Sequence, residues 1–70
     1  MNRPEVTATR LRKARQARDL KVKDLAELVP CSESTVRAIE QNGRRMTISM
    51  AVAIGKVLHV RPAWLLDLEE

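Results

Sequence analysis

The sequence contains few of the residues from which large cores and reactive centres are built. Its 70 residues include no Phe and no Tyr, and Trp64 is the only large aromatic side chain. The core must therefore be aliphatic. It must also be thin, because a chain of this size buries only about 60% of the surface that it exposes when unfolded. We expect one domain over residues 1–70, with residues 1–6 as a flexible lead-in.

Cysteine and histidine are almost absent, since Cys31 and His59 are the only residues of each type. A lone cysteine excludes an intramolecular disulfide bond and a cysteine-rich metal site, and we expect Cys31 to be a small buried side chain. No nucleophile and base are paired, and no cluster has metal-ligand spacing. We therefore expect no catalytic residue, metal, cofactor or small-molecule ligand, which makes an enzyme the least favoured class.

Long hydrophobic runs are also missing. A membrane-spanning helix needs about 20 consecutive apolar residues, and no segment approaches that length. The first residues carry no apolar stretch of the kind that a secretory signal peptide requires. The sequence thus predicts a cytoplasmic protein that does not bind membranes.

Basic residues, in contrast, are present and unevenly placed. The net charge is +4, but residues 1–23 hold eight Lys or Arg against two acids, whereas residues 24–70 hold five against seven. A basic segment on a small domain is typical of a protein that binds the phosphate backbone of nucleic acid. An ordinary solvated helix face would give the same charge pattern.

Apolar spacing predicts an all-α fold of five helices, over residues 7–18, 22–28, 33–41, 48–58 and 62–68. The bounds follow from helix signals: Ser32, Thr47 and Pro62 suit helix starts, while Asn42, Gly43 and a left-handed His59 suit helix ends. Three- and four-residue spacing also predicts the inward side chains. They are Leu11, Ala14 and the stem of Arg18, then Val22, Leu25, Ala26 and Val29, then Val36 and Ile39, and finally Val52, Ile54, Val57 and Leu58.

The segment from Leu20 to Asn42 is the most informative part of the chain. It combines a short amphipathic helix, a tight turn and a second helix whose outward face is polar, with Glu33, Ser34, Arg37 and Gln41. Two short helices braced through small apolar contacts, the second with an exposed polar face, suit insertion into a DNA major groove.

Six short stretches, in this order and spacing, resemble one known family. They are Leu11-Arg12-Lys13-Ala14-Arg15, Leu25-Ala26-Glu27, Ser32 with Ser34-Thr35-Val36, Ile39-Glu40 before a glycine turn, Leu58-His59-Val60, and Trp64-Leu65-Leu66. The chain is similar over residues 7–67 to the Cro- and phage-repressor-like helix-turn-helix domains, also called the xenobiotic-response-element type. The resemblance implies a compact five-helix, lambda-repressor-like domain. It also implies a bacterial or phage-encoded transcriptional regulator, a repressor that binds double-stranded DNA.

The resemblance assigns a structural ion pair to Arg15 and Glu40. Two positions depart from the family pattern. Val22 stands where members often carry a glutamine that holds a phosphate, so Lys21 and Lys23 are expected to make that contact instead. Pro30 stands where the turn usually carries a glycine, so we expect the turn to follow another path.

The remaining assignments concern DNA. The expected base contacts come from the outward start of the second helix of the motif: Glu33, Ser34, Thr35 and Arg37. The expected phosphate contacts are Arg10, Lys13, Lys21, Lys23, Ser32, Asn42, Arg44 and Arg45. Helix-dipole stabilisation explains Glu33 equally well, and helix capping explains Ser32 better than base contact.

A reading unit this small favours a homodimer, because two recognition helices can then bind two half-sites of a pseudo-palindromic operator. The residues expected at its interface are Trp64, Leu65 and Leu68, although core packing explains Trp64 more simply. An alternative remains open, in which the helix-turn-helix fold serves as a protein-interaction module, such as an antitoxin or adaptor.

Overall fold

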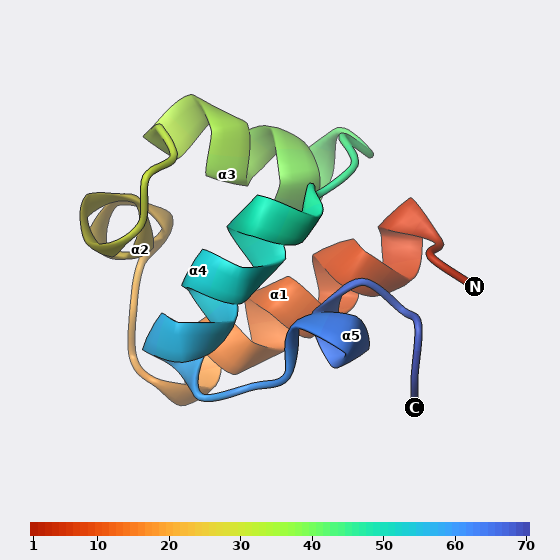
Figure 1. Cartoon of the computed structure of the whole chain (residues 1–70). Helices are drawn as coiled ribbons and strands as arrows, with labels where there is room; N and C mark the ends of the chain where they lie inside the picture. Colours follow the sequence, from red (N-terminus) through yellow and green to blue (C-terminus); the bar gives the residue numbers. More distant parts are fainter.

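Five α-helices and no strand form the chain (Figure 1), and the computed structural model describes all of residues 1–70. The helices are α1 (Pro4–Ala17), α2 (Val22–Leu28), α3 (Glu33–Gln41), α4 (Ile48–Leu58) and α5 (Pro62–Leu65). The all-α architecture expected from the sequence is confirmed. Helix α3 packs on α1 and α2, α4 packs on α5 and α2, and α1 also contacts α5.

Aliphatic side chains from all five helices meet in one core. The largest fully buried side chains are Leu11, Leu25, Val36, Ile39, Ile54 and Leu65. Cys31 and Trp64 are both half-buried, and each packs against the outside of this core. No aromatic ring is therefore needed at the centre of the domain.

The ends of the chain differ from the sequence-based bounds. Pro4 occupies the first turn of α1, so residues 4–6, expected in a flexible lead-in, are helical. At the other end α5 stops at Leu65, not at Leu68, and Asp67 takes a left-handed backbone conformation with φ of 59°. At this turn the Asp67 carboxylate binds Arg3, the residue that precedes α1.

Two expected core positions were wrong. Val52 is 40% exposed and Ala51 is buried in its place, while Arg18 is exposed and Arg15 is buried. In α4 the reason is Gly55: a Cβ there would lie 2.6 Å from the Val60 carbonyl oxygen. The segment that follows α4, at Val60 and Pro62, packs directly on this glycine. The side of α4 that carries Ala51 and Gly55 therefore faces the interior.

The cap residues expected for α3 and α4 are confirmed. The Ser32 hydroxyl accepts a hydrogen bond from the Thr35 N–H at 3.2 Å, and the Thr47 hydroxyl accepts one from the Met50 N–H at 3.1 Å. His59 follows α4 with φ of 59°. Each hydroxyl satisfies a backbone donor that the first turn of a helix leaves free.

None of the helices has the length and apolar character needed to cross a bilayer. No three His, Cys, Asp or Glu side chains come together in a way that could hold a metal ion. What the fold does position is the pair α2 and α3, which stands at one end of the molecule (Figure 1).

Candidate nucleic-acid interface

The turn between α2 and α3 follows a path that proline suits. The Cys31 N–H donates a hydrogen bond to the Val29 carbonyl at 2.8 Å, which closes a three-residue γ-turn centred on Pro30. The fixed negative φ of proline matches the common inverse form of this turn. The different turn path expected from Pro30 is thus observed, and it needs no residue with positive φ.

Helix α3 begins with three hydroxyl side chains bonded to one another. Besides capping the Thr35 N–H, the Ser32 Oγ lies 3.0 Å from the Thr35 Oγ1 and 3.2 Å from the Ser34 Oγ. Ser32 is therefore a helix cap, whatever else it contacts. Ser32 and Ser34 are exposed, so both hydroxyls can also reach a ligand in front of the helix.

The two sides of α3 differ sharply in polarity. Val36 and Ile39 are fully buried, whereas Ser34, Arg37 and Gln41 are exposed and Glu33 is partly exposed. Arg37 donates from Nε and Nη2 to the Glu33 Oε2, at 3.1 and 2.6 Å. The polar side of α3 is consequently open to solvent and carries one preformed ion pair.

A buried ion pair fixes α3 against α1. The Arg15 Nε and Nη2 donate to the two Glu40 carboxylate oxygens at 2.7 and 2.8 Å, and the Glu40 side chain is 2% exposed. Hydrogen bonding to Glu40 raises the pKa of Arg15. Arg15 also donates to the Leu20 carbonyl, and Arg12 to the Glu40 carbonyl, each at 2.8 Å. These bonds set the angle at which α3 leaves the core.

Most of the expected phosphate-binding side chains are exposed. These are Lys13, Lys21, Lys23, Ser32, Asn42, Arg44 and Arg45. At the start of α2 the backbone N–H of Lys21 donates to the Asp24 carboxylate at 2.9 Å. The side chains of Lys21 and Lys23 are exposed to solvent. After α3, Gly43 has a φ of 72° and redirects the chain so that the Arg44 N–H reaches the Ala38 carbonyl.

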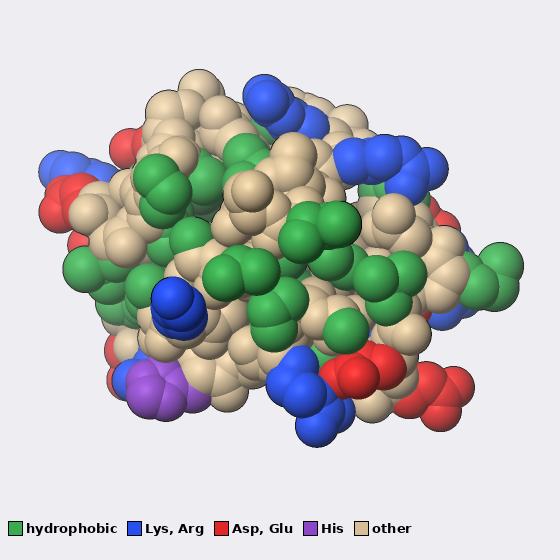
Figure 2. Space-filling model, viewed as in Figure 1, with side chains coloured by type: hydrophobic (Ala, Val, Ile, Leu, Met, Phe, Trp, Pro, Cys, Tyr) green, Lys and Arg blue, Asp and Glu red, His purple; other side chains and the backbone are tan.

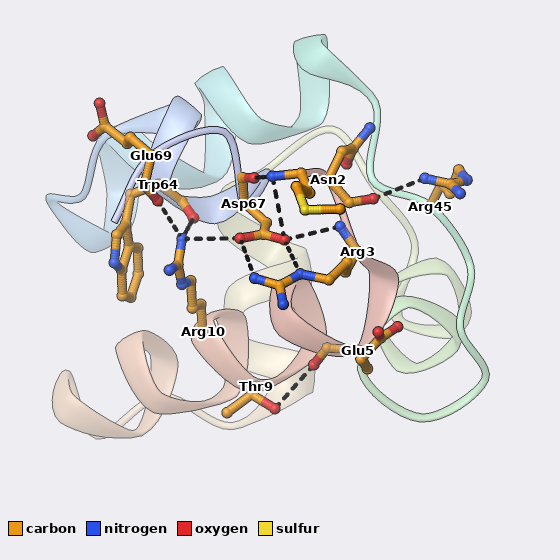
Figure 3. Close-up of polar contacts among 10 residues, drawn as sticks. Asn2, Arg3, Glu5, Thr9, Arg10, Arg45, Trp64, Asp67 and Glu69 are labelled. Atoms are coloured by element: carbon orange, nitrogen blue, oxygen red, sulfur yellow. Dashed lines mark hydrogen bonds and ion pairs between the residues drawn. The ribbon is translucent and has the colours of Figure 1, made fainter.

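Arg10, expected to bind phosphate, is occupied inside the protein (Figure 3). Its Nη1 donates to the backbone carbonyls of Trp64 and Glu69 at 2.5 and 2.7 Å, and its guanidinium lies 5.1 Å from the centre of the Trp64 ring. Only 17% of the side chain is exposed. Arg10 thus holds the end of the chain, a role that local sequence could not reveal because its partners lie more than 50 residues away.

Asp67 is a structural residue that sequence reasoning missed. Arg3 donates to the Asp67 carboxylate from its backbone N–H at 3.1 Å, from Nε at 2.7 Å and from Nη2 at 3.2 Å (Figure 3). These hydrogen bonds, together with the charge of Arg3, hold the pKa of Asp67 well below its usual range. The Asn2 N–H bonds the Asp67 carbonyl, and Arg45 donates to the Asn2 carbonyl at 3.0 Å, so the two termini are joined near Arg45.

The expected dimer residues are separated by the fold. Leu65 is fully buried and cannot reach a partner, Trp64 is half-buried beside Arg10, and only Leu68 is clearly exposed. Other exposed apolar side chains lie on α4, at Ile48 (72% exposed) and Val52. Figure 2 shows apolar side chains gathered on the face where α4 lies.

Comparison with known proteins gives one family and two related structures. A model of a helix-turn-helix family matches residues 11–65. The structure resembles the restriction-modification controller protein C.AhdI from Aeromonas hydrophila, with 26% identity, 89% of this chain and 94% of that chain covered, and a TM-score of 0.80. It also shares the fold of a single-residue variant of C.Esp1396I, described as bound to its highest affinity operator site OM. For this second structure the identity is 23%, the match covers 93% of this chain and 86% of that chain, and the TM-score is 0.78. No curated protein sequence matches the chain.

Proposed function

We propose that this chain represses transcription by placing the polar face of α3 in the major groove of an operator. The chain belongs to the helix-turn-helix family, whose model matches residues 11–65. It is a DNA-binding transcriptional regulator. The observation that carries the proposal is the open polar side of α3 on a helix fixed by the Arg15–Glu40 pair. Such a helix can enter the groove without rearranging the core. We infer a location in the bacterial cytoplasm, because the proposed operator DNA lies there.

Base recognition is assigned to the first two turns of α3. Ser34 and Thr35 can donate or accept hydrogen bonds, and Arg37 can bond the two acceptor atoms of a guanine. One good bidentate contact contributes about 1–3 kcal/mol of discrimination against the wrong base. Arg37 is therefore the main specificity residue of the proposed interface.

Phosphate binding is assigned to the exposed cations on either side of α3. Lys21 and Lys23 at the start of α2, with Lys13 on α1, provide one group, and Arg44 and Arg45 provide the other. Ser32 and Asn42 can add hydrogen bonds at the two ends of α3. These contacts would fix the register on DNA and supply most of the salt-dependent affinity.

The active form is proposed to be a homodimer on a pseudo-palindromic operator, with half-sites about one DNA turn apart. The surface proposed to bind a second copy is the apolar side of α4 around Ile48 and Val52, which are both exposed, as is Leu68. Trp64 and Leu65 act behind this surface by holding α5 in place. Association of two copies would bury the Ile48 and Val52 side chains, and this burial would stabilise a domain whose own core is thin.

Salt dependence tests the proposal. Fragments of the source genome are selected with the purified protein, and the affinity for a selected duplex is measured between 50 and 200 mM salt. Six or more phosphate contacts predict a loss of about 10³-fold or more over this range. An antitoxin or adaptor that binds another protein through an apolar interface would select no duplex, and its affinity would barely respond to salt.

A further inference from the structure

Arg37 is already held in place before any DNA is bound. Its side chain is 51% exposed, and it bonds Glu33, one helical turn earlier, through Nε and Nη2. Both hydrogen bonds end on the same carboxylate oxygen, the Glu33 Oε2. Residues four apart lie above one another on a helix, so the pair stays on the outer face of α3.

The geometry leaves the end of the guanidinium free. Arginine has five N–H donors in a rigid planar fork, of which Glu33 engages Nε and one donor of Nη2. The two donors of Nη1 and the second donor of Nη2 have no partner in the protein and point away from the carboxylate. The end-on pair formed by Nη1 and Nη2 is the arrangement that can bond O6 and N7 of a guanine.

The same carboxylate disfavours other positions of the arginine. An arginine has about 2 kcal/mol of rotamer entropy and can reach a phosphate as easily as a base. Glu33 would hold the guanidinium towards the groove. If Arg37 moved away to bind a phosphate, the negative charge of Glu33 would lose its partner, which disfavours that position. Holding a side chain in its bound conformation reduces the entropy that is lost on binding.

We propose that Glu33 is a positioning residue which aims Arg37 at one guanine in each half-site, so that the Glu33–Arg37 pair sets the base preference at that position. The proposal rests on the proposed function and deepens it. It also reassigns Glu33, which the sequence suggested as a base contact. The carboxylate acts through Arg37 and needs no cytosine partner.

The test is a selection from a randomised duplex library with the wild-type protein and four variants. Arg37→Ala removes the base contact, and Glu33→Gln removes only the charge that positions it. The double variant Glu33→Gln/Arg37→Ala measures the coupling between the two residues. Glu27→Gln is the matched control, because it deletes an exposed carboxylate on α2 that bonds to no arginine. Circular dichroism confirms that each variant is folded.

Base preference is then measured by titrating the selected duplex and a copy in which the guanine is replaced. We expect Arg37→Ala to reduce the preference for guanine about 5- to 150-fold at a single position. Glu33→Gln should reduce it about two- to fivefold at the same position, as expected for an exposed ion pair. Glu33→Gln should change nothing once Arg37 is already Ala, and Glu27→Gln should leave the preference intact.

Two results would overturn the inference while leaving the proposed function standing. In one, Glu33→Gln keeps the wild-type preference at the position that depends on Arg37. In the other, Glu33→Gln changes a different base pair, which would make Glu33 a base contact in its own right. A wild-type protein that enriches no sequence would overturn the proposed function and this inference together.

Discussion

Two buried carboxylates, Glu40 and Asp67, join distant parts of this small fold through arginine side chains. Glu40 binds Arg15 of α1, and Asp67 binds Arg3, the residue that precedes α1. The first pair could be placed from sequence, because Arg15 and Glu40 lie within stretches that resemble a known family. The second could not, since Arg3 and Asp67 are 64 residues apart and no local pattern joins them.

Removing one member of the first pair should destabilise the protein severely. Glu40→Gln leaves the Arg15 charge buried without a counter-ion, and we expect a loss of about 3–5 kcal/mol in the free energy of unfolding. That is a large share of the total free energy of unfolding, which is ~0.05–0.15 kcal/mol for each residue of a typical domain. Urea denaturation measures the effect, with Arg12→Ala as the control.

Arg12 is half-exposed, donates to the Glu40 backbone carbonyl at 2.8 Å and lies 3.9 Å from the Glu40 carboxylate. Its replacement leaves Arg15 paired with Glu40, so it should cost no more than about 1.5 kcal/mol. The double variant Arg15→Met/Glu40→Met should be more stable than either single charge deletion, because it leaves no charge unpaired. Equal urea midpoints for Glu40→Gln and Arg12→Ala would contradict this account.

Asp67 should make the stability of the fold depend on acid. The pKa of Asp67 is lower in the folded protein than in the unfolded chain, where it is about 3.9. The Asp67 charge therefore stabilises the fold above about pH 3.9, and this stabilisation is lost as the pH falls from there towards the folded-state pKa. Asp67→Asn should therefore melt below the wild type at pH 7, and this difference should shrink steadily below about pH 4. Thermal melts across pH 2 to 7 measure it.

Asp19→Asn controls for net charge, because Asp19 is exposed and bonds to no arginine. A melting difference between Asp67→Asn and the wild type that persisted unchanged to the lowest pH would show that the Asp67 charge does not stabilise the fold.

At the scale of single elements, cap residues and hydrophobic spacing predicted α2, α3 and α4 at the bounds observed. Ser32, Thr47 and His59 act through local backbone bonds, so local sequence is sufficient to place them. Rotation about a helix axis depends on distant packing, and in α4 the prediction was wrong at Val52, although Ile54 and Leu58 are buried as expected. Its inward face is set by Gly55 beneath the Val60 carbonyl, a contact that hydrophobic spacing cannot show.

Gly55→Ala should therefore destabilise α4, although alanine is normally the better helix former by about 1 kcal/mol. The added Cβ would lie 2.6 Å from the Val60 carbonyl oxygen, and backbone must move to relieve the contact. We expect a loss of about 1–3 kcal/mol in the free energy of unfolding, measured by chemical denaturation.

Ser49→Ala is the control, because Ser49 lies exposed in the same helix and should change stability by less than about 0.5 kcal/mol. If Gly55→Ala proved more stable than the wild type, the close approach of α4 and the segment that follows it could not hold in solution.

At the scale of the whole molecule, surface side chains were the hardest to assign from sequence. The basic N-terminal third predicted phosphate contacts, but the fold divides its basic side chains into two groups. Arg3, Arg10 and Arg15 bind the protein's own carboxylates or carbonyls, whereas Lys13, Lys21 and Lys23 remain free. Composition gives the sum of the charges, and only the folded structure shows which of them can reach a ligand.

The proposed dimer gives a prediction at this scale. Ile48→Asp should convert a homodimer into a monomer in sedimentation experiments, because it places a charge in the apolar surface of α4. Ile48 is the first residue of α4, where an acidic side chain favours the helix dipole, so folding should be preserved.

Leu28→Asp is the matched control, because Leu28 is a similarly exposed apolar residue on α2. A wild-type protein that sediments as a monomer both free and on DNA would contradict the dimer, as would dissociation caused by Leu28→Asp alone.

The central claim, that the outer side of α3 contacts DNA, is tested most directly by backbone amide chemical shifts recorded with and without a selected duplex. We predict the largest changes at residues 32–37, with a second group at residues 21–23 where α2 begins. Changes confined to α4 and α5, with the amides of α3 unmoved, would contradict the account.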